Sequence, residues 1–409
     1  MSGAASARAS GGEQERKVSL DVFRGAAVAL MILVNNPGSW NALFTPLAHA
    51  PWHGCTPTDL VFPFFLFAVG NALALGMPAL RDGSKRAFWR KWAQRAGLIF
   101  AIGVFLNMSP FLRWDASGDL VWRSLEQLRV MGVLQRIALA WAGAALIAWA
   151  WGERGAWWAS AALLLGYWAA CVFFAQGANP GADAYSIEGF FGTAVDRAVL
   201  GSAHLYKGEG VPFDPEGLAS TLPAVAQVLL GYLVGTRLRS ARIDAELVTR
   251  LFVAGCLTLA LAYLWQLVMP LNKKLWTSSY VLHTTGLALL VLALLLFAIE
   301  LRGQRDSGRP RAAWVAFFEV FGKNALFVFV LSGFVPRVLG LLRWSDGVDA
   351  AGQPRFITPL PWVYRNVFEP LANEANDARI GSLLYAIAHL ALYWALARWL
   401  DRRRIYIRV

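Results

Sequence analysis

The feature that most constrains this chain is a series of apolar segments about as long as a membrane-spanning helix. About 20 apolar residues cross the hydrocarbon core of a bilayer as a helix. The sequence predicts ten such spans, near residues 20–35, 59–78, 94–110, 130–150, 156–176, 219–236, 250–269, 279–299, 322–341 and 380–400. The chain is 57% apolar and 16% charged, whereas soluble domains average about 45–50% and about 25%. An all-α polytopic membrane protein is therefore expected.

One apolar segment leaves the number of spans open. Residues 312–321 are too short to cross a bilayer alone. They form either an interfacial helix that leads into the ninth span or part of an eleventh span. The interfacial interpretation is preferred, because an even number of spans keeps both termini on one side.

The distribution of charge predicts which side that is. With both termini in the cytoplasm, the cytoplasmic loops hold 23 of the 38 Lys and Arg residues and the opposite loops hold 11. Cytoplasmic loops of membrane proteins carry such an excess. The chain then divides into a tail at 1–17, one membrane domain at 18–401 and a basic tail at 402–409. Long loops near 36–58, 176–218 and 343–378 face outward.

Composition also excludes several classes of protein. The net charge of +12 follows the cytoplasmic loops, so it does not indicate nucleic-acid binding. The three cysteines form no CxxC pair and predict no metal site. No GxxxxGK[ST] sequence is present, which argues against an ATP-driven pump. The first span carries Asp21 and Arg24, and we interpret it as a retained helix rather than a signal peptide.

The first hairpin holds the strongest candidates for chemistry. His49 lies in a loop rich in proline and tryptophan, between Asn35 at the end of the first span and Asp59 at the start of the second. A histidine can take or give a proton near neutral pH. Asp59 could orient it, and a carboxamide could hold an oxyanion. A surface histidine with a structural hydrogen bond remains the alternative, and His53 is equally plausible on chemistry alone.

Charged groups within spans are costly and are candidates for function. Arg136 lies inside the fourth span, seven residues after Arg129, and needs a carboxylate or a ligand anion as partner. An intramembrane salt bridge is as plausible as a ligand site. Arg24 is spaced to pair with Asp21 on one helix face.

Polar groups also cluster before three later spans. Asp214 and Glu216 could bind an amino-bearing substrate or simply cap the sixth span. Lys273 stands against the charge bias and could hold an anion, while Trp276 suits either a site or an interfacial anchor. Asn324 begins the ninth span and could bond between helices.

In this order, these segments resemble the heparan-α-glucosaminide N-acetyltransferase family and its bacterial relatives, within the transmembrane acyltransferases. The matching segments spread over residues 18–330. They are Leu20–Gly25, Val34–Asn35, His49 with Trp52 and Gly54, Asp59–Pro63, Gly132–Arg136, Asp196–Arg197, His204–Tyr206, Asp214–Gly217, Asn272–Lys273, Leu275–Trp276, Ser279–Tyr280 and Asn324. His53 stands where the family has the asparagine of Trp-Asn-Gly.

The resemblance implies acetyl transfer from cytoplasmic acetyl-CoA, without a metal, to the amino group of a glucosamine-type sugar on the periplasmic side of a bacterial inner membrane. The family's catalytic histidine falls on His49 and its preceding asparagine on Asn35, and Asp59 is expected to orient His49. Contacts with the sugar are expected from Trp52, His53, Asp214, Glu216, Lys273 and Trp276. Contacts with acetyl-CoA are expected from Arg24, Arg129, Arg136 and Asn324.

Two other functions use the same polar residues. One is a secondary transporter or exporter of sugars or cell-wall intermediates, and the other is an O-acyltransferase acting on polysaccharide hydroxyls. The expected partners are the lipid bilayer and the amino-sugar acceptor, without nucleic acid. A homodimer is left open.

Overall fold

Helices dominate the computed structural model, which describes residues 17–175, 183–305, 312–350, 352–374 and 376–407. The long helices are α1 (Val18–Asn35), α2 (Val61–Arg81), α3 (Lys85–Met108), α4 (Val133–Phe173), α6 (Thr221–Ser240), α7 (Ala245–Trp265), α8 (Ser278–Leu295), α10 (Ala313–Lys323), α11 (Ala325–Leu339) and α14 (Ala378–Arg402). The apolar segments of the sequence therefore fold into a helical bundle, as expected for a multi-pass membrane protein.

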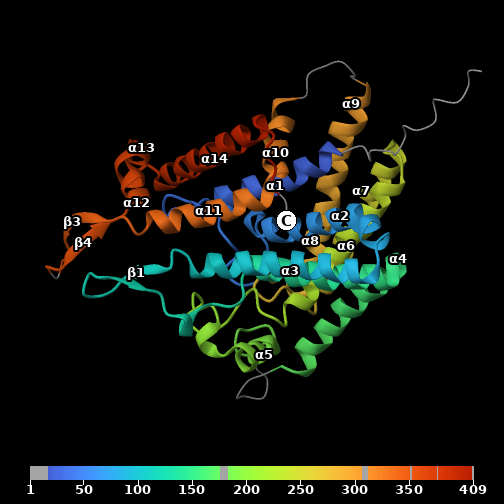
Figure 1. The fold of residues 1–409 in the computed structure, drawn as a ribbon, viewed down its shortest axis with the longest axis horizontal. Helices are drawn as coiled ribbons and strands as arrows, with labels where there is room; N and C mark the ends of the chain where they lie inside the picture. The colour runs from blue at the N-terminus through green and yellow to red at the C-terminus, as the bar shows by residue number, and fades with distance from the viewer. Residues whose placement is uncertain (1–16, 176–182, 306–311, 351, 375, 408–409) are drawn as a thin grey trace, which may run out of the picture.

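Short elements gather at one end of the bundle, at the left of Figure 1. They include two antiparallel hairpins, β1 (Leu112–Trp114) with β2 (Leu120–Trp122) and β3 (Trp344–Val348) with β4 (Pro354–Ile357). The short helices of the connections are α5 (Phe191–Leu200), α12 (Pro359–Val363), α13 (Glu369–Glu374), and the 3₁₀ turns η1 (Thr45–Leu47), η2 (Pro57–Leu60), η3 (Leu125–Gln127) and η4 (Ser202–His204). Two of the segments predicted to be loops, 176–218 and 343–378, thus contain short helices or strands, while the fold as a whole is helical, as the sequence predicts.

The opposite end carries the short basic connections. It includes the turn before Lys85, the turn after Ser240 and the π-helical extension of α8, η5 (Leu296–Leu301), which continues into α9 (Arg302–Arg305). A second π-helical turn, η6 (Tyr364–Phe368), joins α12 to α13 at the other end. We refer to the two ends as the His49 end and the basic end.

Seven helices of the described chain are long and apolar enough to cross a membrane, or eight if one bent pair is a single span. The sequence predicts ten, and two elements account for the difference. Helix α4 is 41 residues long and is counted once, although Gly152 breaks it with φ 65° where two spans were expected. Helix α3 begins nine residues earlier than predicted. Its first half is rich in basic residues, so the helix is not counted among those apolar enough to cross a membrane.

The bent pair is α10 and α11, which meet at Asn324 with an angle of 77°. The short segment 312–321, for which an interfacial helix was preferred, is therefore a helix set sharply against the ninth span. Helix α10 packs on α1 with almost no space between the backbones. A Cβ on Gly25 would lie 1.8 Å from the carbonyl oxygen of Phe318, and one on Gly322 would lie 2.0 Å from that of Asp21. Small residues permit such approaches between membrane helices.

Candidate active site

The first hairpin brings His49 and Asp59 into direct contact. Asp59 Oδ1 lies 2.7 Å from His49 Nδ1. The carboxylate is 1% exposed, whereas the imidazole is 45% exposed. Because Nδ1 is held by the carboxylate, Nε2 is the ring nitrogen left for chemistry. The structure thus places in contact the histidine and the carboxylate that the hairpin sequence singles out.

Asp59 is held firmly because it caps the start of α2. Its Oδ2 accepts hydrogen bonds from the backbone N–H of Thr56 and of Ala50, both at 3.0 Å. Thr56 and Asp59 together form a capping box at η2. The hydroxyl of Tyr280 donates to the backbone oxygen of Asp59 at 2.6 Å. One carboxylate oxygen therefore fixes the backbone, while the other is presented to His49.

Lys273 joins this pair from the connection before α8. Its Nζ lies 3.1 Å from His49 Nδ1 and 3.3 Å from Asp59 Oδ1. Burial lowers the pKa of the Lys273 ammonium, while the charge of Asp59 acts in the opposite direction. Lys273 was expected at the substrate, and its nearest partners are instead the two groups of the first hairpin.

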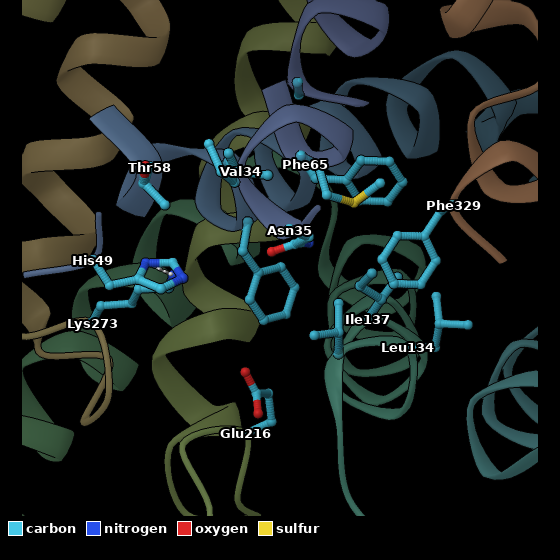
Figure 2. Close-up of a pocket in the computed structure, with 15 residues that line it drawn as sticks. Val34, Asn35, His49, Thr58, Phe65, Leu134, Ile137, Glu216, Lys273 and Phe329 are labelled. Carbon is cyan, nitrogen blue, oxygen red and sulfur yellow. Dashed lines mark hydrogen bonds between the residues drawn. The ribbon is translucent and has the colours of Figure 1, made fainter. Parts of the chain in front are cut away.

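A cavity of about 180 Å³ lies beside these groups, and we call it the His49 cavity. His49 and Lys273 lie on one side of it, and Phe65, Phe329, Leu134 and Ile137 lie opposite (Figure 2). Asn35, at the last turn of α1, also lines the cavity. The structure therefore brings together the three residues expected to be catalytic.

Glu216 enters the same cavity from the connection before α6 (Figure 2). Arg129 holds both acids of this segment, with Nη2 2.6 Å from Asp214 Oδ1 and 2.5 Å from Glu216 Oε2. Asp214 is 2% exposed and is an ion-pair partner of Arg129, whereas Glu216 also lines the cavity. Arg129 was expected to bind acetyl-CoA, but its guanidinium is engaged here and stacks on the ring of Tyr206.

Arg136 and Trp276 are corrections to the expected site. Arg136 is fully buried, and Nη2 donates to the backbone oxygen of Pro215 at 2.7 Å and to the hydroxyl of Ser220. Its guanidinium lies 5.0 Å from the centre of the Trp276 ring, and Trp276 is 1% exposed. The segment that carries Glu216 covers Arg136, and neither Arg136 nor Trp276 is exposed in the structure.

Trp52 and His53 lie next to the cavity and tie the first loop to its neighbours. The indole N–H of Trp52 donates to the backbone oxygen of Tyr185 at 2.8 Å. His53 Nδ1 lies 3.3 Å from Asn272 Nδ2, and burial lowers its pKa. His49 lines the His49 cavity, whereas His53 is not among its lining residues.

Cys55 is the remaining residue of this loop with a potential nucleophile. Burial, helped by the charge of Asp59, raises the pKa of its thiol to about 12. A thiol with that pKa remains protonated near neutral pH and is a poor nucleophile. Cys55 is therefore a weaker candidate for chemistry than His49.

A second, larger cavity of about 490 Å³ lies further along the bundle, and we call it the Arg95 cavity. Arg24, Arg95 and Lys323 line it, and Asp21 is the acidic lining residue. Arg24 Nη2 donates to Asp21 Oδ1 at 2.6 Å, as their spacing predicts. Arg24 pairs with Asp21, and Lys323 pairs with Glu319 and Asp401, so Arg95 is the lining cation that would attract an anion most directly.

The two cavities are neighbours, because Phe65 and Ile137 line both. On each of three helices, the lining residues of both cavities form one stripe at helical spacing. These residues are Asp21, Arg24, Ala27, Met31, Val34 and Asn35 on α1, Val61, Phe62, Phe65, Ala68, Val69, Ala72 and Leu75 on α2, and Val133, Leu134, Ile137 and Trp141 on α4. Arg24 and Asn35 are 11 residues apart on α1, which is about 16 Å at 1.5 Å per residue.

The sequence did not single out Arg95 or Lys323 as site residues. Arg95 was treated as one of several loop charges, because the third span was expected to begin at residue 94. In the structure it lies in the third turn of α3 with its guanidinium over the Trp141 ring. Asn324 was expected at acetyl-CoA, but both polar atoms of its side chain bind the segment that follows α14.

No protein-family model matches the chain. The chain is similar to the heparan-alpha-glucosaminide N-acetyltransferase of Homo sapiens, with 27% identity over 361 residues, and to that of Mus musculus, with 27% identity over 362 residues. Each match covers 76% of this chain and 52% of the relative. The chain thus spans about half the length of the curated relatives it matches. This similarity supports the family resemblance inferred from the motifs.

Proposed function

We propose that this protein is a transmembrane acetyltransferase that moves the acetyl group of acetyl-CoA to the amino group of a glucosamine-type sugar. The observation that carries the proposal is the buried Asp59 carboxylate on His49 Nδ1, beside a cavity that adjoins a second, cationic cavity. The similarity to two enzymes named as glucosaminide N-acetyltransferases supports the reaction class.

The Arg95 cavity suits the donor. Acetyl-CoA carries phosphates at one end and its thioester at the end of a long, uncharged pantetheine arm. Arg24, Arg95 and Lys323 would hold the phosphates by charge-assisted hydrogen bonds. The arm would pass Phe65 and Ile137 and bring the thioester toward His49. The distance of about 16 Å between Arg24 and Asn35 is within the reach of such an arm.

His49 would act at Nε2. The amine attacks the thioester carbon while Nε2 takes a proton from the nitrogen, and a tetrahedral oxyanion forms. The carboxamide of Asn35 lines the cavity and would donate a hydrogen bond to that oxyanion. Collapse breaks the carbon–sulfur bond, and the imidazolium returns its proton to the leaving thiolate. Asp59 stabilises the imidazolium in between. If His49 instead carries the acetyl group, Nε2 is the acylated atom.

The acceptor amine would be received by Glu216. Its carboxylate faces the His49 cavity and is held by Arg129 through Oε2. A carboxylate at this place attracts an ammonium group before it loses its proton. Trp52 and His53 follow His49 in the same loop, with their ring centres 6.3 Å apart, and would contact the sugar outside the cavity.

We further propose that the basic end faces the cytoplasm and the His49 end faces the periplasm of a bacterial inner membrane. The two parts of α4, the basic helix α3 and the bent pair α10–α11 would complete ten crossings. The excess of Lys and Arg in the connections of the basic end supports this orientation.

A secondary transporter is the second candidate. The observation that favours it is that Phe65 and Ile137 separate two cavities that lie one beyond the other along the bundle. A transporter would move the sugar without consuming acetyl-CoA, so release of free CoA distinguishes the two functions.

The experiment that tests the proposal uses purified protein in detergent with acetyl-CoA and glucosamine. We expect formation of N-acetylglucosamine with equal release of free thiol, and a loss of at least about a hundredfold in kcat for His49→Ala. His389→Ala is the matched control, because His389 on α14 bonds within its own helix. Full activity of His49→Ala, or transport without thiol release, would refute the proposal.

A further inference from the structure

The chain turns back into the bundle after α14. Arg404 adopts φ 57°, the left-handed conformation that ends a helix in a Schellman motif. The N–H of Ile405 donates to the carbonyl oxygen of Leu400 at 2.9 Å, and that of Arg404 donates to Asp401 at 3.0 Å. These are the two hydrogen bonds of that motif. They direct the following residues back toward the bundle. We call residues 403–407 the return segment.

Asn324 fastens the return segment. Its Nδ2 donates to the carbonyl oxygen of Ile405 at 3.0 Å, and its Oδ1 accepts from the N–H of Ile407 at 2.9 Å. Asn324 is 1% exposed and stands at the 77° break between α10 and α11. One side chain thus pairs with two backbone groups of the segment, so the carboxamide is engaged on both sides.

A second set of contacts holds the start of the segment. Lys323 Nζ lies 3.0 Å from Asp401 Oδ1 and 3.1 Å from Glu319 Oε1. The hydroxyl of Tyr406 donates to the same Asp401 oxygen at 3.0 Å. Because Lys323 also lines the Arg95 cavity, these contacts join the segment to the cationic end of that cavity.

The end of the described chain reaches the cavity itself. Ile407 lines the Arg95 cavity together with Arg24, Arg95 and Lys323. Its position depends on the hydrogen bond from its N–H to Asn324. An apolar side chain among these cations would pack against the donor rather than bind its phosphates.

We infer that the return segment forms part of the donor site and that Asn324 is a positioning residue, which acts on acetyl-CoA through Ile407. This inference rests on the proposed function, because it takes the Arg95 cavity as the donor site. It replaces the direct contact between Asn324 and acetyl-CoA that the sequence predicts. The affinity for the donor therefore depends on a segment more than 75 residues away in sequence from Asn324.

The test measures the Kd of CoA and the KM of both substrates for two variants. Asn324→Ala removes both bonds to the segment, and we expect about a tenfold higher Kd for CoA with little change in the acceptor KM. Ile407→Trp fills the cavity from the segment itself and leaves the break between α10 and α11 intact. We expect a similar rise of about tenfold or more.

Two controls separate this effect from damage to the fold. Asn366→Ala removes an exposed carboxamide that bonds within its own helix, and Ile387→Trp enlarges an exposed residue of α14. Both should bind CoA as the unsubstituted protein does. If the unsubstituted protein does not bind CoA, the proposed function fails. If it binds CoA and both Asn324→Ala and Ile407→Trp bind equally well, the inference alone is overturned.

Discussion

The His49 cavity and the Arg95 cavity share two lining residues but are built for different tasks. The first has a volume of about 180 Å³ and is lined by His49, Lys273 and Glu216. Of these, His49 and Lys273 are in contact. The second is about 490 Å³ and holds three cations with one acid. The smaller cavity has the groups for proton transfer, and the larger one has the room and charge to hold an anion. The difference suggests that chemistry and donor binding are separated along the bundle.

Each cavity also depends on a different kind of support. In the His49 cavity, Asp59 is fixed by backbone N–H groups within ten residues of itself. In the Arg95 cavity, Lys323 and Ile407 depend on contacts between helix α10 and the segment after α14. Local hydrogen bonds hold the Asp59 carboxylate, with Tyr280 and Lys273 as more distant partners, whereas contacts between distant segments hold Lys323 and Ile407.

The largest effect is expected at the orienting acid. Asp59→Asn keeps the shape of the cap but removes the charge that stabilises an imidazolium at His49. We expect kcat to fall about a hundredfold while the donor KM stays within about twofold. Asp115→Asn, which alters another loop carboxylate that accepts a backbone N–H, should leave kcat unchanged. An unaltered kcat in Asp59→Asn would contradict the assignment of proton transfer to the His49 cavity.

A smaller effect on KM should distinguish the two cavities, because each is expected to bind a different substrate. Arg95→Ala removes a charge from the Arg95 cavity, and Glu216→Gln removes one from the His49 cavity. We expect the first to raise the donor KM about tenfold and the second to raise the acceptor KM about tenfold, since a hydrogen bond to a charged group contributes about 1.5–3 kcal/mol. Steady-state kinetics with each substrate varied in turn measures the division.

Matched controls for this division lie nearby in the chain. Arg90 is exposed on the same helix as Arg95, and Glu126 is exposed in the connection that precedes Arg129. Arg90→Ala and Glu126→Gln should change neither KM. If Arg95→Ala raised the acceptor KM instead, the separation of the two tasks would be wrong.

The smallest effect concerns the support of Glu216. Asp196 on α5 accepts the N–H of Leu218 at 2.8 Å, and burial raises the pKa of its carboxyl to about 6. A carboxyl with a raised pKa stabilises the fold when protonated, and this contribution is lost as pH rises from about 4 to about 6. The midpoint temperature of thermal unfolding should therefore decrease as the pH rises from about 4.5 to about 7. This decrease should be smaller in Asp196→Asn. Equal pH dependence in both proteins would contradict the raised pKa.

The sequence predicts that Asn35, His49 and Asp59 lie together because they are close in the chain. Asn35, His49 and Asp59 belong to one hairpin, so a loop and two helix ends suffice to bring them together. Asp59 caps α2 as its position before an apolar run indicates. The apolar segments likewise predict the helices, because each one must satisfy its own backbone in lipid.

Long-range partners could not be predicted in the same way. A buried arginine requires a partner, but the sequence does not say which one. In the structure, Arg136 donates to the backbone oxygen of Pro215. Lys273 reaches Asp59 across more than 200 residues. By contrast, the break of the long α4 at Gly152 falls in the short gap that the sequence predicts between its fourth and fifth spans.

In the proposed reaction, the donor and the acceptor meet from opposite ends of the bundle. Reconstituted vesicles in which the protein has one orientation, established by protease accessibility of the connections at the basic end, test it most directly. Acetyl-CoA is supplied only on the side of the basic end and glucosamine only on the side of His49. We expect N-acetylglucosamine on the His49 side and free CoA on the other. Product only when both substrates share one side would contradict it.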